Sequence, residues 1–306
     1  MIISMADILK KAKQEHYGVA APNVFNDKTI EAAFQTSAEF KAPVILDGAG
    51  CHGIEELAYI SRFYERRYPE ACVALNLDHG GAYEEIMLAI RSGFSSVMVD
   101  RSELPYDENV REVKEIVKAA HAVGVSVEAE LGHVGQGFEY ESTRDSGLTD
   151  KKEALSFIEE TGVDCLAVAV GTSHGVYKGT PHLEFELLKE LSESIEIPLV
   201  LHGGSGTGDE NLKKAVETGI QKVNLFTDLS AEGVVSLKSY LGVNFDHIPK
   251  DAEKGEFGNL NANLYDAIVE GTKGWKTALK HYVELFGGTD RLSQSSRQSH
   301  QPVLHG

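Results

Sequence analysis

Short apolar runs alternate with longer amphipathic stretches along most of the chain. The apolar runs are rich in valine, isoleucine and leucine, and each has about the length of one β-strand. We predict strands at residues 18–22, 43–47, 73–78, 95–100, 125–131, 165–170, 197–202 and 220–225. Strands covered on both faces form continuous hydrophobic runs, so this pattern is typical of a buried parallel sheet.

A helical pattern follows each predicted strand. The predicted helices lie at residues 28–40, 54–66, 82–92, 107–123, 150–161, 184–194, 208–218 and 229–240, and Asp150 and Asp209 stand where N-caps belong. Eight strand–helix units predict a closed (β/α)8 TIM barrel rather than an open sheet. An open doubly wound sheet would have fewer strands and a glycine fingerprint after the first one, and none follows Asn23.

The last part of the chain lies outside this repeat. Residues 242–263 are polar and rich in glycine and asparagine, which indicates a long loop. Residues 264–286 predict an additional C-terminal helix with an apolar side, packed either on its own barrel or on a partner subunit. We therefore expect a single domain over residues 1–286. The remaining residues, 287–306, are rich in serine, glutamine and histidine and are expected to be disordered.

Charge and cysteine usage narrow the class of protein. The formal net charge is −18 and no stripe of basic residues is present, which excludes nucleic acid as the main partner. No apolar run has membrane-spanning length, and residues 1–13 form an amphipathic start rather than a signal peptide. Cys51, Cys72 and Cys165 lie far apart without a CxxC spacing, which argues against disulfides and thiolate zinc sites. We expect a cytoplasmic enzyme.

Polar residues stand at the predicted carboxyl ends of the strands, where barrel enzymes carry their catalytic groups. In chain order they are Asn23, Asp47, Asp78, His79, Asp100, Glu130, His174, His202 and Asn224. Three imidazoles with an open fourth position suit a catalytic zinc or a similar divalent ion. We predict this role for His79, His174 and His202, which each end a strand beside a glycine. A single histidine in such a place would more often be hydrogen-bonded without a metal.

Two segments near the last two strands indicate a phosphate site. Residues 202–208 read HGGSGTG and residues 224–228 read NLFTD. Glycines let backbone N–H groups approach an anion, and barrels commonly bind phosphate on the loops after strands seven and eight. Lys178, four residues after His174, is a candidate for the positive charge.

Five motifs resemble a known family. They are NLDHG at 76–80, EAELG at 128–132, AVGTSHGVY at 169–177, PLVLHGGSG at 198–206 and KVNLFTDL at 222–229. Their order and spacing are similar to those of class II ketose-bisphosphate aldolases, the group that holds fructose- and tagatose-bisphosphate aldolases. The resemblance covers roughly residues 1–290.

The resemblance implies a metal-dependent lyase that reversibly cleaves a ketose 1-phosphate or 1,6-bisphosphate to dihydroxyacetone phosphate and an aldehyde. It implies zinc or another divalent ion on His79, His174 and His202, with Glu130 as an alternate or supporting ligand. Asp78 would be the general acid/base at the hydroxyl of the aldehyde carbon; the alternative is a carboxylate that only orients a metal ligand. Glu139 or Glu141, on the loop after Glu130, would protonate the enediolate.

The resemblance also implies how the ketone phosphate is bound. The implied substrate- and phosphate-binding residues are Asn23, Gly175, Lys178, Gly203, Gly204, Ser205, Asn224 and Thr227. A monovalent cation, Na⁺ or K⁺, often lies near them in the family. Members form homodimers and homotetramers, so we expect a homo-oligomer.

The chain departs from the family on the aldehyde side. Relatives that take a phosphorylated aldehyde carry serine or threonine where this chain has Ala49, and an arginine from a partner subunit where it has Val269. Fructose-bisphosphate aldolases carry an acid where Phe226 stands. We therefore hypothesise a carboxylated or uncharged aldehyde partner, and Arg101 is a candidate contact for an anionic tail.

Three alternatives stay open at this point. The chain could be a fructose- or tagatose-bisphosphate aldolase proper, in which another cation replaces the arginine; the candidates are Lys273, Lys276 and Arg291. It could be a phosphosugar isomerase or epimerase on the same barrel. It could also be a non-catalytic partner subunit, although the combination of Asp78 with three histidines argues against that role.

Overall fold

Eight parallel strands form the central barrel of the computed structural model, which describes residues 1–134, 147–173, 175, 181–244 and 262–292. The strands are β1 Val19–Pro22, β2 Pro43–Ala49, β3 Cys72–Gly80, β4 Ser96–Val99, β5 Ser126–Leu131, β6 Cys165–Val168, β7 Leu199–Leu201 and β8 Lys222–Leu225. From β2 to β8 each strand pairs with the next one in sequence, and β8 pairs with β1. A bridge between Asn23 and Asp47 joins β1 to β2 and completes the ring. The predicted (β/α)8 barrel is confirmed.

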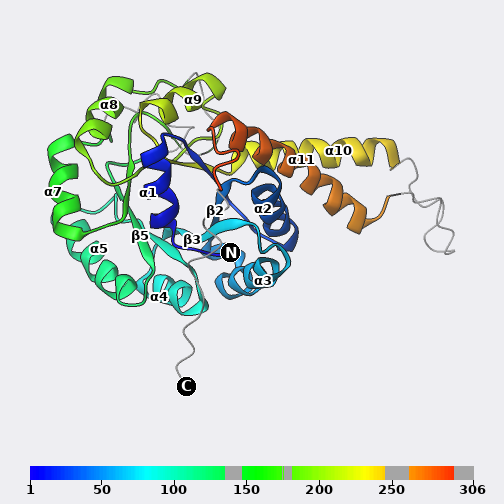
Figure 1. Cartoon of the computed structure of the whole chain (residues 1–306), viewed down its shortest axis with the longest axis horizontal. Coiled ribbons are helices and arrows are strands. Elements are labelled where there is room, and N and C mark those ends of the chain that lie inside the picture. Colours follow the sequence, from blue (N-terminus) through cyan, green and yellow to red (C-terminus); the bar gives the residue numbers. More distant parts are fainter. Residues whose placement is uncertain (135–146, 174, 176–180, 245–261, 293–306) are drawn as a thin grey trace, which may run out of the picture.

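Helices surround the barrel as a second layer (Figure 1). They are α2 Asp27–Phe40, α3 Ile54–Arg67, α4 Tyr83–Ser92, α5 Tyr106–His121, α7 Lys151–Thr161, α8 Phe185–Ser194, α9 Asp209–Thr218 and α10 Thr227–Asn244, with the short η1 Gly50–His52 after β2. Asp150 caps α7 as predicted, because its side chain accepts from the N–H groups of Lys152 and Glu153. The cap predicted at Asp209 is wrong, since α9 begins at that residue and Gly208 precedes it.

An N-terminal helix, α1 Met5–Glu15, closes one end of the barrel and lies across its front in Figure 1. Its buried residues pack with Ile45, Ala74 and Val200 from inside the barrel. The Lys13 ammonium donates to the carbonyl oxygens of Ile195 and Ile197, which precede β7. The amphipathic start seen in the sequence is therefore a plug at the amino-terminal ends of the strands, so the opposite end is the one left for a site.

Two long helices, α10 and α11 Leu264–Leu285, run side by side and project from the barrel (Figure 1). They pack closely because Gly274 of α11 faces the backbone of α10 at Glu232, and the Ser236 hydroxyl donates to the Glu270 carbonyl oxygen. The sequence predicted α11 well, but α10 runs to Asn244 and enters the segment expected to be a loop. Residues 245–261 lie outside the described residues.

The chain after α11 is tied back to the barrel as far as Leu292. The Gly18 N–H donates to the Phe286 carbonyl oxygen, and the N–H groups of Asp290 and Leu292 donate to the carbonyl oxygens of Phe40 and Lys41. Residues 287–292 therefore differ from the disordered tail that we expected, and 293–306 lie outside the described residues.

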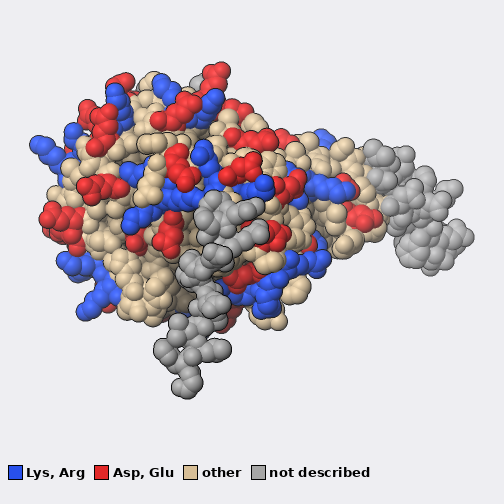
Figure 2. Space-filling view, viewed as in Figure 1, with Lys and Arg blue, Asp and Glu red and all other residues tan. Residues whose placement is uncertain are grey.

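Lysine, arginine and acidic side chains are interspersed on the face that carries α1 (Figure 2). Cys51, Cys72 and Cys165 are free thiols. Among the helices of the described residues, none combines the length and the apolar character needed to cross a membrane.

A methyl group at Gly274 should force α10 and α11 apart. A Cβ there would collide with the Glu232 carbonyl oxygen and lie 2.7 Å from the Ser236 Cβ. We expect Gly274→Ala to lower the free energy of unfolding by about 1–3 kcal/mol, the usual cost of overpacking. Thermal unfolding followed by circular dichroism measures the change.

Gly271→Ala is the matched control on the same helix. A Cβ at Gly271 would lie 3.5 Å from the Gly233 carbonyl oxygen, an ordinary contact, and alanine favours a helix over glycine by about 1 kcal/mol. We expect an unchanged or higher melting temperature. Equal melting temperatures for the two variants would contradict the close packing assigned to Gly274.

Candidate functional site

The end of β3 carries two adjacent residues whose side chains both reach the open mouth of the barrel. Successive side chains of a regular strand point to opposite faces, but the register of β3 against β4 shifts between Leu77 and Gly80. His79 lies within this bulge in the left-handed region, with φ of 49°. Such a conformation costs about 1 kcal/mol or more and is typical of functional sites. The bulge thus brings Asp78 and His79 to one place.

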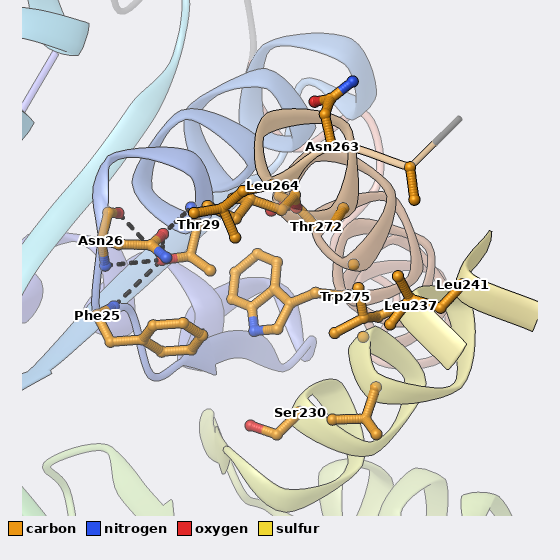
Figure 3. Close-up of a pocket in the computed structure, with 16 residues that line it drawn as sticks. Phe25, Asn26, Thr29, Ser230, Leu237, Leu241, Asn263, Leu264, Thr272 and Trp275 are labelled. Atoms are coloured by element: carbon orange, nitrogen blue, oxygen red, sulfur yellow. Dashed lines mark hydrogen bonds between the residues drawn. The ribbon is translucent and has the colours of Figure 1, made fainter. Parts of the chain in front are cut away.

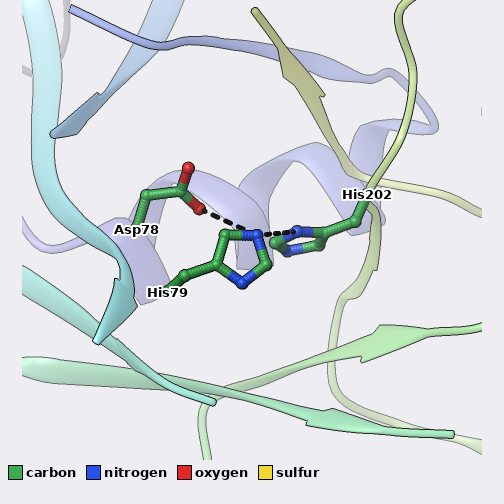
Figure 4. Close-up of side chains that lie close together, drawn as sticks. All are labelled: Asp78, His79 and His202. Carbon is green, nitrogen blue, oxygen red and sulfur yellow. Dashed lines mark hydrogen bonds and ion pairs between the residues drawn. The ribbon is translucent and has the colours of Figure 1, made fainter. Parts of the chain in front are cut away.

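The imidazoles of His79 and His202 face each other at this mouth (Figure 4). The Nε2 of His79 lies 3.1 Å from the Nδ1 of His202. Each ring donates its other nitrogen's proton to a carboxylate: His79 Nδ1 lies 2.7 Å from Asp100 Oδ2, and His202 Nε2 lies 2.8 Å from Glu128 Oε1. Ionised carboxylates only accept, so both facing nitrogens are left to share a cation, either a proton or a metal ion.

The spacing fits a metal ion. Zinc–nitrogen bonds of 2.0–2.1 Å at a tetrahedral angle place two ligand nitrogens about 3.3 Å apart. Two overlapping groups surround this position, Asp78 with His79 and His202, and His79 with Asp100 and Glu130. Glu130 is buried, and its Oε2 atom has no hydrogen-bond partner although its Oε1 accepts from the Val134 N–H. Two imidazoles with an unsatisfied buried carboxylate oxygen suit zinc or a related divalent ion.

The electrostatics also favour a cation at this position. Burial alone would lower the pKa of His79, but Asp78 and the hydrogen bond to Asp100 raise it to about 10. Burial alone would raise the pKa of Asp78, but His79, His202 and Lys222 lower it to about 2. Both pKa shifts therefore favour positive charge beside the Asp78 carboxylate, which a divalent ion would supply.

Two asparagines hold the Asp78 carboxylate from strands on either side. The Asn23 amide after β1 donates to Asp78 Oδ2 at 2.8 Å, and the Asn224 amide of β8 donates to Asp78 Oδ1 at 3.2 Å. Asp78 Oδ1 lies 3.8 Å from His79 Nε2. Asn23 and Asn224, predicted to bind substrate, are thus observed to orient Asp78.

The predicted phosphate loop after β7 lies against the start of α10. The Ser205 hydroxyl accepts from the N–H groups of Phe226 and Asp228 at 3.2 Å each, and α10 begins between them at Thr227. Gly203 has φ of 67°, and a Cβ there would collide with the Ser173 carbonyl oxygen, so only glycine fits. A glycine loop beside a helix N-terminus is a favourable place for a phosphate.

Asp228 connects this loop to α11. Its Oδ2 atom accepts from the Gly206 N–H at 2.9 Å and from the Tyr282 hydroxyl at 2.6 Å. Nothing in the sequence pattern pointed to this contact, because its partners lie far apart in the chain. Through Asp228, the predicted phosphate loop is therefore hydrogen-bonded to the C-terminal helix α11.

Several predicted residues take other positions. His174, Lys178, Glu139 and Glu141 lie outside the described residues, so their predicted roles stay predictions. Gly175, next to His174, is exposed with φ of 80°. The Arg101 side chain is largely buried and donates to Glu112 and to the carbonyl oxygens of Gly80 and Asp100. The Arg101 guanidinium is therefore engaged within the chain, which argues against its predicted role as a contact for an anionic aldehyde tail.

No role was predicted for Asp100 or Glu128, and Lys222 was not a candidate site residue. A signal was available in the two-residue period of strands. Glu128 precedes Glu130 by two residues, and Lys222 precedes Asn224 by two, so each shares a barrel-facing side with a predicted site residue. What the spacing could not show is that Glu128 and Lys222 contact each other.

Paired imidazoles and carboxylates at the carboxyl end of a (β/α)8 barrel define the class of a metal-dependent barrel enzyme. The family model for class II fructose-bisphosphate aldolase matches residues 3–291. A fructose-bisphosphate aldolase from Thermus caldophilus is 37% identical, over 95% of this chain and 100% of that protein. The chain belongs to the class II fructose-bisphosphate aldolase family and is a metal-dependent aldolase, a lyase.

Solved structures agree with this assignment. The YdjI aldolase from Escherichia coli K12 is 30% identical, with a TM-score of 0.80 over 96% of this chain and 100% of that chain. The fructose-bisphosphate aldolase of Campylobacter jejuni shares the fold, with 23% identity and a TM-score of 0.79 over 94% of this chain and 96% of that chain. Divalent-metal dependence is general for the family.

Proposed function

We propose that the chain cleaves and forms the carbon–carbon bond of a ketose phosphate, with dihydroxyacetone phosphate as the ketone half. The observation that carries this proposal is the Asp78 carboxylate, fixed between Asn23 and Asn224 at 3.8 Å from His79. Retro-aldol cleavage removes a hydroxyl proton and leaves a negatively charged enediolate. The positioned carboxylate can remove the hydroxyl proton, and a cation at the neighbouring site can stabilise the negative charge of the enediolate.

His79 and His202 would hold the metal ion, with Glu130 close enough to join and His174 as the third imidazole expected from the sequence. When bound, a divalent ion acts as a Lewis acid for the substrate oxygens. Asp100 and Glu128 would hold the two imidazoles in the tautomers that place a lone pair on His79 Nε2 and on His202 Nδ1.

The chain's own residues perform the remaining steps. Asp78 is ionised at neutral pH because its pKa is about 2, and it accepts the proton of the substrate hydroxyl. The Gly203–Ser205 loop and the N-terminus of α10 receive the phosphate of the ketone half, and Asp228 holds that loop in place. A monovalent cation near this phosphate remains part of the proposal.

Asp78→Ala should separate catalysis from metal binding. We expect full zinc content by elemental analysis and a fall in turnover of about 10²–10⁴-fold, the usual contribution of a general acid or base. The assay detects dihydroxyacetone phosphate released from ketose phosphates. His202→Ala should lose both zinc and activity.

Either of two results would count against these roles. Full zinc occupancy in His202→Ala would remove it from the ligand set, and near-normal turnover in Asp78→Ala would remove the acid/base assignment. A wild-type chain that holds zinc but cleaves no ketose phosphate would instead support the non-catalytic partner subunit.

We propose further that the aldehyde half is uncharged. The residues that depart from the family on this side, Ala49, Val269 and Phe226, offer no charge, and Phe226 is 48% exposed. Arg101 is occupied by Glu112. The three cations considered as replacements also contact their own chain: Lys273 meets Glu270, Lys276 meets Gln35, and Arg291 meets the Gly287 carbonyl oxygen.

Cleavage rates on paired substrates test the aldehyde proposal. We expect kcat/KM for a ketose 1-phosphate to equal or exceed the value for the corresponding 1,6-bisphosphate, because the cations considered for the second phosphate, within the described part of the chain, are engaged by other groups. A preference for the bisphosphate of tenfold or more would contradict this proposal and favour a fructose- or tagatose-bisphosphate aldolase proper.

A homo-oligomer that uses the α10–α11 pair is also proposed. The two helices enclose an apolar groove of about 600 Å³ beside the loop after β1 (Figure 3). Its lining includes Phe25, Val234, Leu237, Leu264, Ile268 and Trp275. Exposed apolar surface of this kind on projecting helices is typical of an interaction surface, and a second copy would cover it.

Sedimentation velocity tests the oligomer. We expect the wild type to sediment as a dimer or larger species, and Val234→Glu, at an exposed position that lines the groove, to shift it toward monomer. Val123→Glu, equally exposed on the turn before β5, is the control and should leave the distribution unchanged. A wild type that is monomeric at every concentration would contradict the proposal.

A further inference from the structure

A buried cluster of one lysine and two carboxylates lies inside the barrel, next to the imidazole of His202. The Lys222 ammonium of β8 donates to Glu128 Oε2 of β5 at 2.8 Å and lies 3.3 Å from Asp47 Oδ2 of β2. All three side chains are 0% exposed. The second oxygen of Glu128, Oε1, lies 2.8 Å from His202 Nε2. A continuous polar chain therefore runs from Lys222 through Glu128 to His202 and on to His79.

The chemistry of Lys222 fixes the direction of every hydrogen bond in this chain. An ammonium group has three donors and no acceptor, so the Glu128 oxygen that faces it must accept. The other carboxylate oxygen also accepts, which requires the proton of His202 to lie on Nε2. The Nδ1 of His202 is then an acceptor that points toward His79.

We propose that Lys222 is a positioning residue, which acts through Glu128 to hold His202 as its Nε2–H tautomer and keeps the Nδ1 lone pair at the metal position. The inference rests on the proposed function in that it takes Nδ1 of His202 to be the metal-binding atom. It adds a residue that touches neither metal nor substrate.

Stability alone gives a weak reason for this ion pair. Replacing buried ion pairs by apolar residues of similar size is often neutral or stabilising. A role as an amine nucleophile does not fit either, because Lys222 is sealed from the mouth. Burial alone would lower the pKa of Lys222, but Asp47 and Glu128 raise it, so the amine stays charged. A fixed cation that orients Glu128 accounts for both observations.

Glu128→Gln gives a directional test. The amide must turn its oxygen toward Lys222, which leaves its NH2 group facing His202 Nε2. His202 Nε2 then has to accept, and the proton moves to Nδ1, where a metal ion should bind. We expect zinc affinity to fall by about 10–100-fold, as is usual when the partner of a ligating histidine is changed.

Removing the cation from the same variant should reverse the effect. In Glu128→Gln/Lys222→Met the amide is free to turn its oxygen toward His202, so the Nε2–H tautomer and most of the zinc affinity should return. A merely structural role for Lys222 predicts the opposite, since the second substitution would only add damage. Glu130→Gln, on the same strand, is the matched control for the tautomer readout alone, because it removes the same charge without touching His202 Nε2. Its own place at the metal position excludes it as a control for zinc affinity.

Two readouts separate this inference from the proposed function. Nitrogen chemical shifts of the ¹⁵N-labelled imidazoles in zinc-free protein report the tautomer of His202, assigned by its loss in His202→Ala. Competition with a chromophoric chelator reports zinc affinity. We expect the Nδ1–H tautomer only in Glu128→Gln, with wild type, Glu130→Gln and the double variant all Nε2–H.

An unchanged His202 tautomer in Glu128→Gln would overturn the inference, and so would a folded double variant that keeps the Nδ1–H form. Circular dichroism establishes folding; should the double variant not fold, the comparison of Glu128→Gln with Glu130→Gln decides alone. Zinc retained in full by His202→Ala would instead overturn the proposed metal role while the tautomer result stands.

Discussion

The close approach of His79 Nε2 and His202 Nδ1 is the constraint on which the rest of the site depends. Two nitrogens lie at 3.1 Å, and the other nitrogen of each ring is hydrogen-bonded to Asp100 or Glu128, so the position between the rings suits a cation. The chain accepts a left-handed residue and a bulge at the end of β3 to create this space. The same bulge supplies Asp78, so the cation site and the carboxylate come from one local distortion.

Much of the fold follows from local patterns in the sequence. The eight apolar runs and their helices determine the barrel because burial on both faces leaves few other arrangements. The barrel in turn determines which strand ends meet, so His79, His202 and Asp78 could be placed at one mouth from their positions alone. Their convergence required no knowledge of side-chain contacts. The left-handed conformation of His79 could not be foreseen, since it depends on the register between β3 and β4.

The contacts that the sequence did not show are those between distant residues that carry no local signal. Lys222 and Glu128 each look like an ordinary charged residue within a strand, and only their pairing inside the barrel explains their burial. Asp228 and Tyr282 join the phosphate loop to α11 in the same way. The glycine contact between α10 and α11 also depends on two helices meeting. His174, Lys178 and Glu139 lie outside the described residues, so the sequence remains the basis for their roles.

The layered interior of the barrel explains why the buried charged residues Asp47, Glu128 and Lys222 have defined partners. Its lower level is apolar, formed by residues such as Ile45, Ala74 and Val200 against α1, and its next level holds Asp47, Glu128 and Lys222 without exposure. These side chains are removed from bulk solvent above the end that α1 covers, and hydrogen bonds in such an environment are electrostatically stronger than in water. An unpaired charge at that level would be costly, so each group must have a definite partner. By covering the amino-terminal end of the barrel, α1 thereby helps to fix the partner of Glu128, and through it the orientation of His202 at the opposite end.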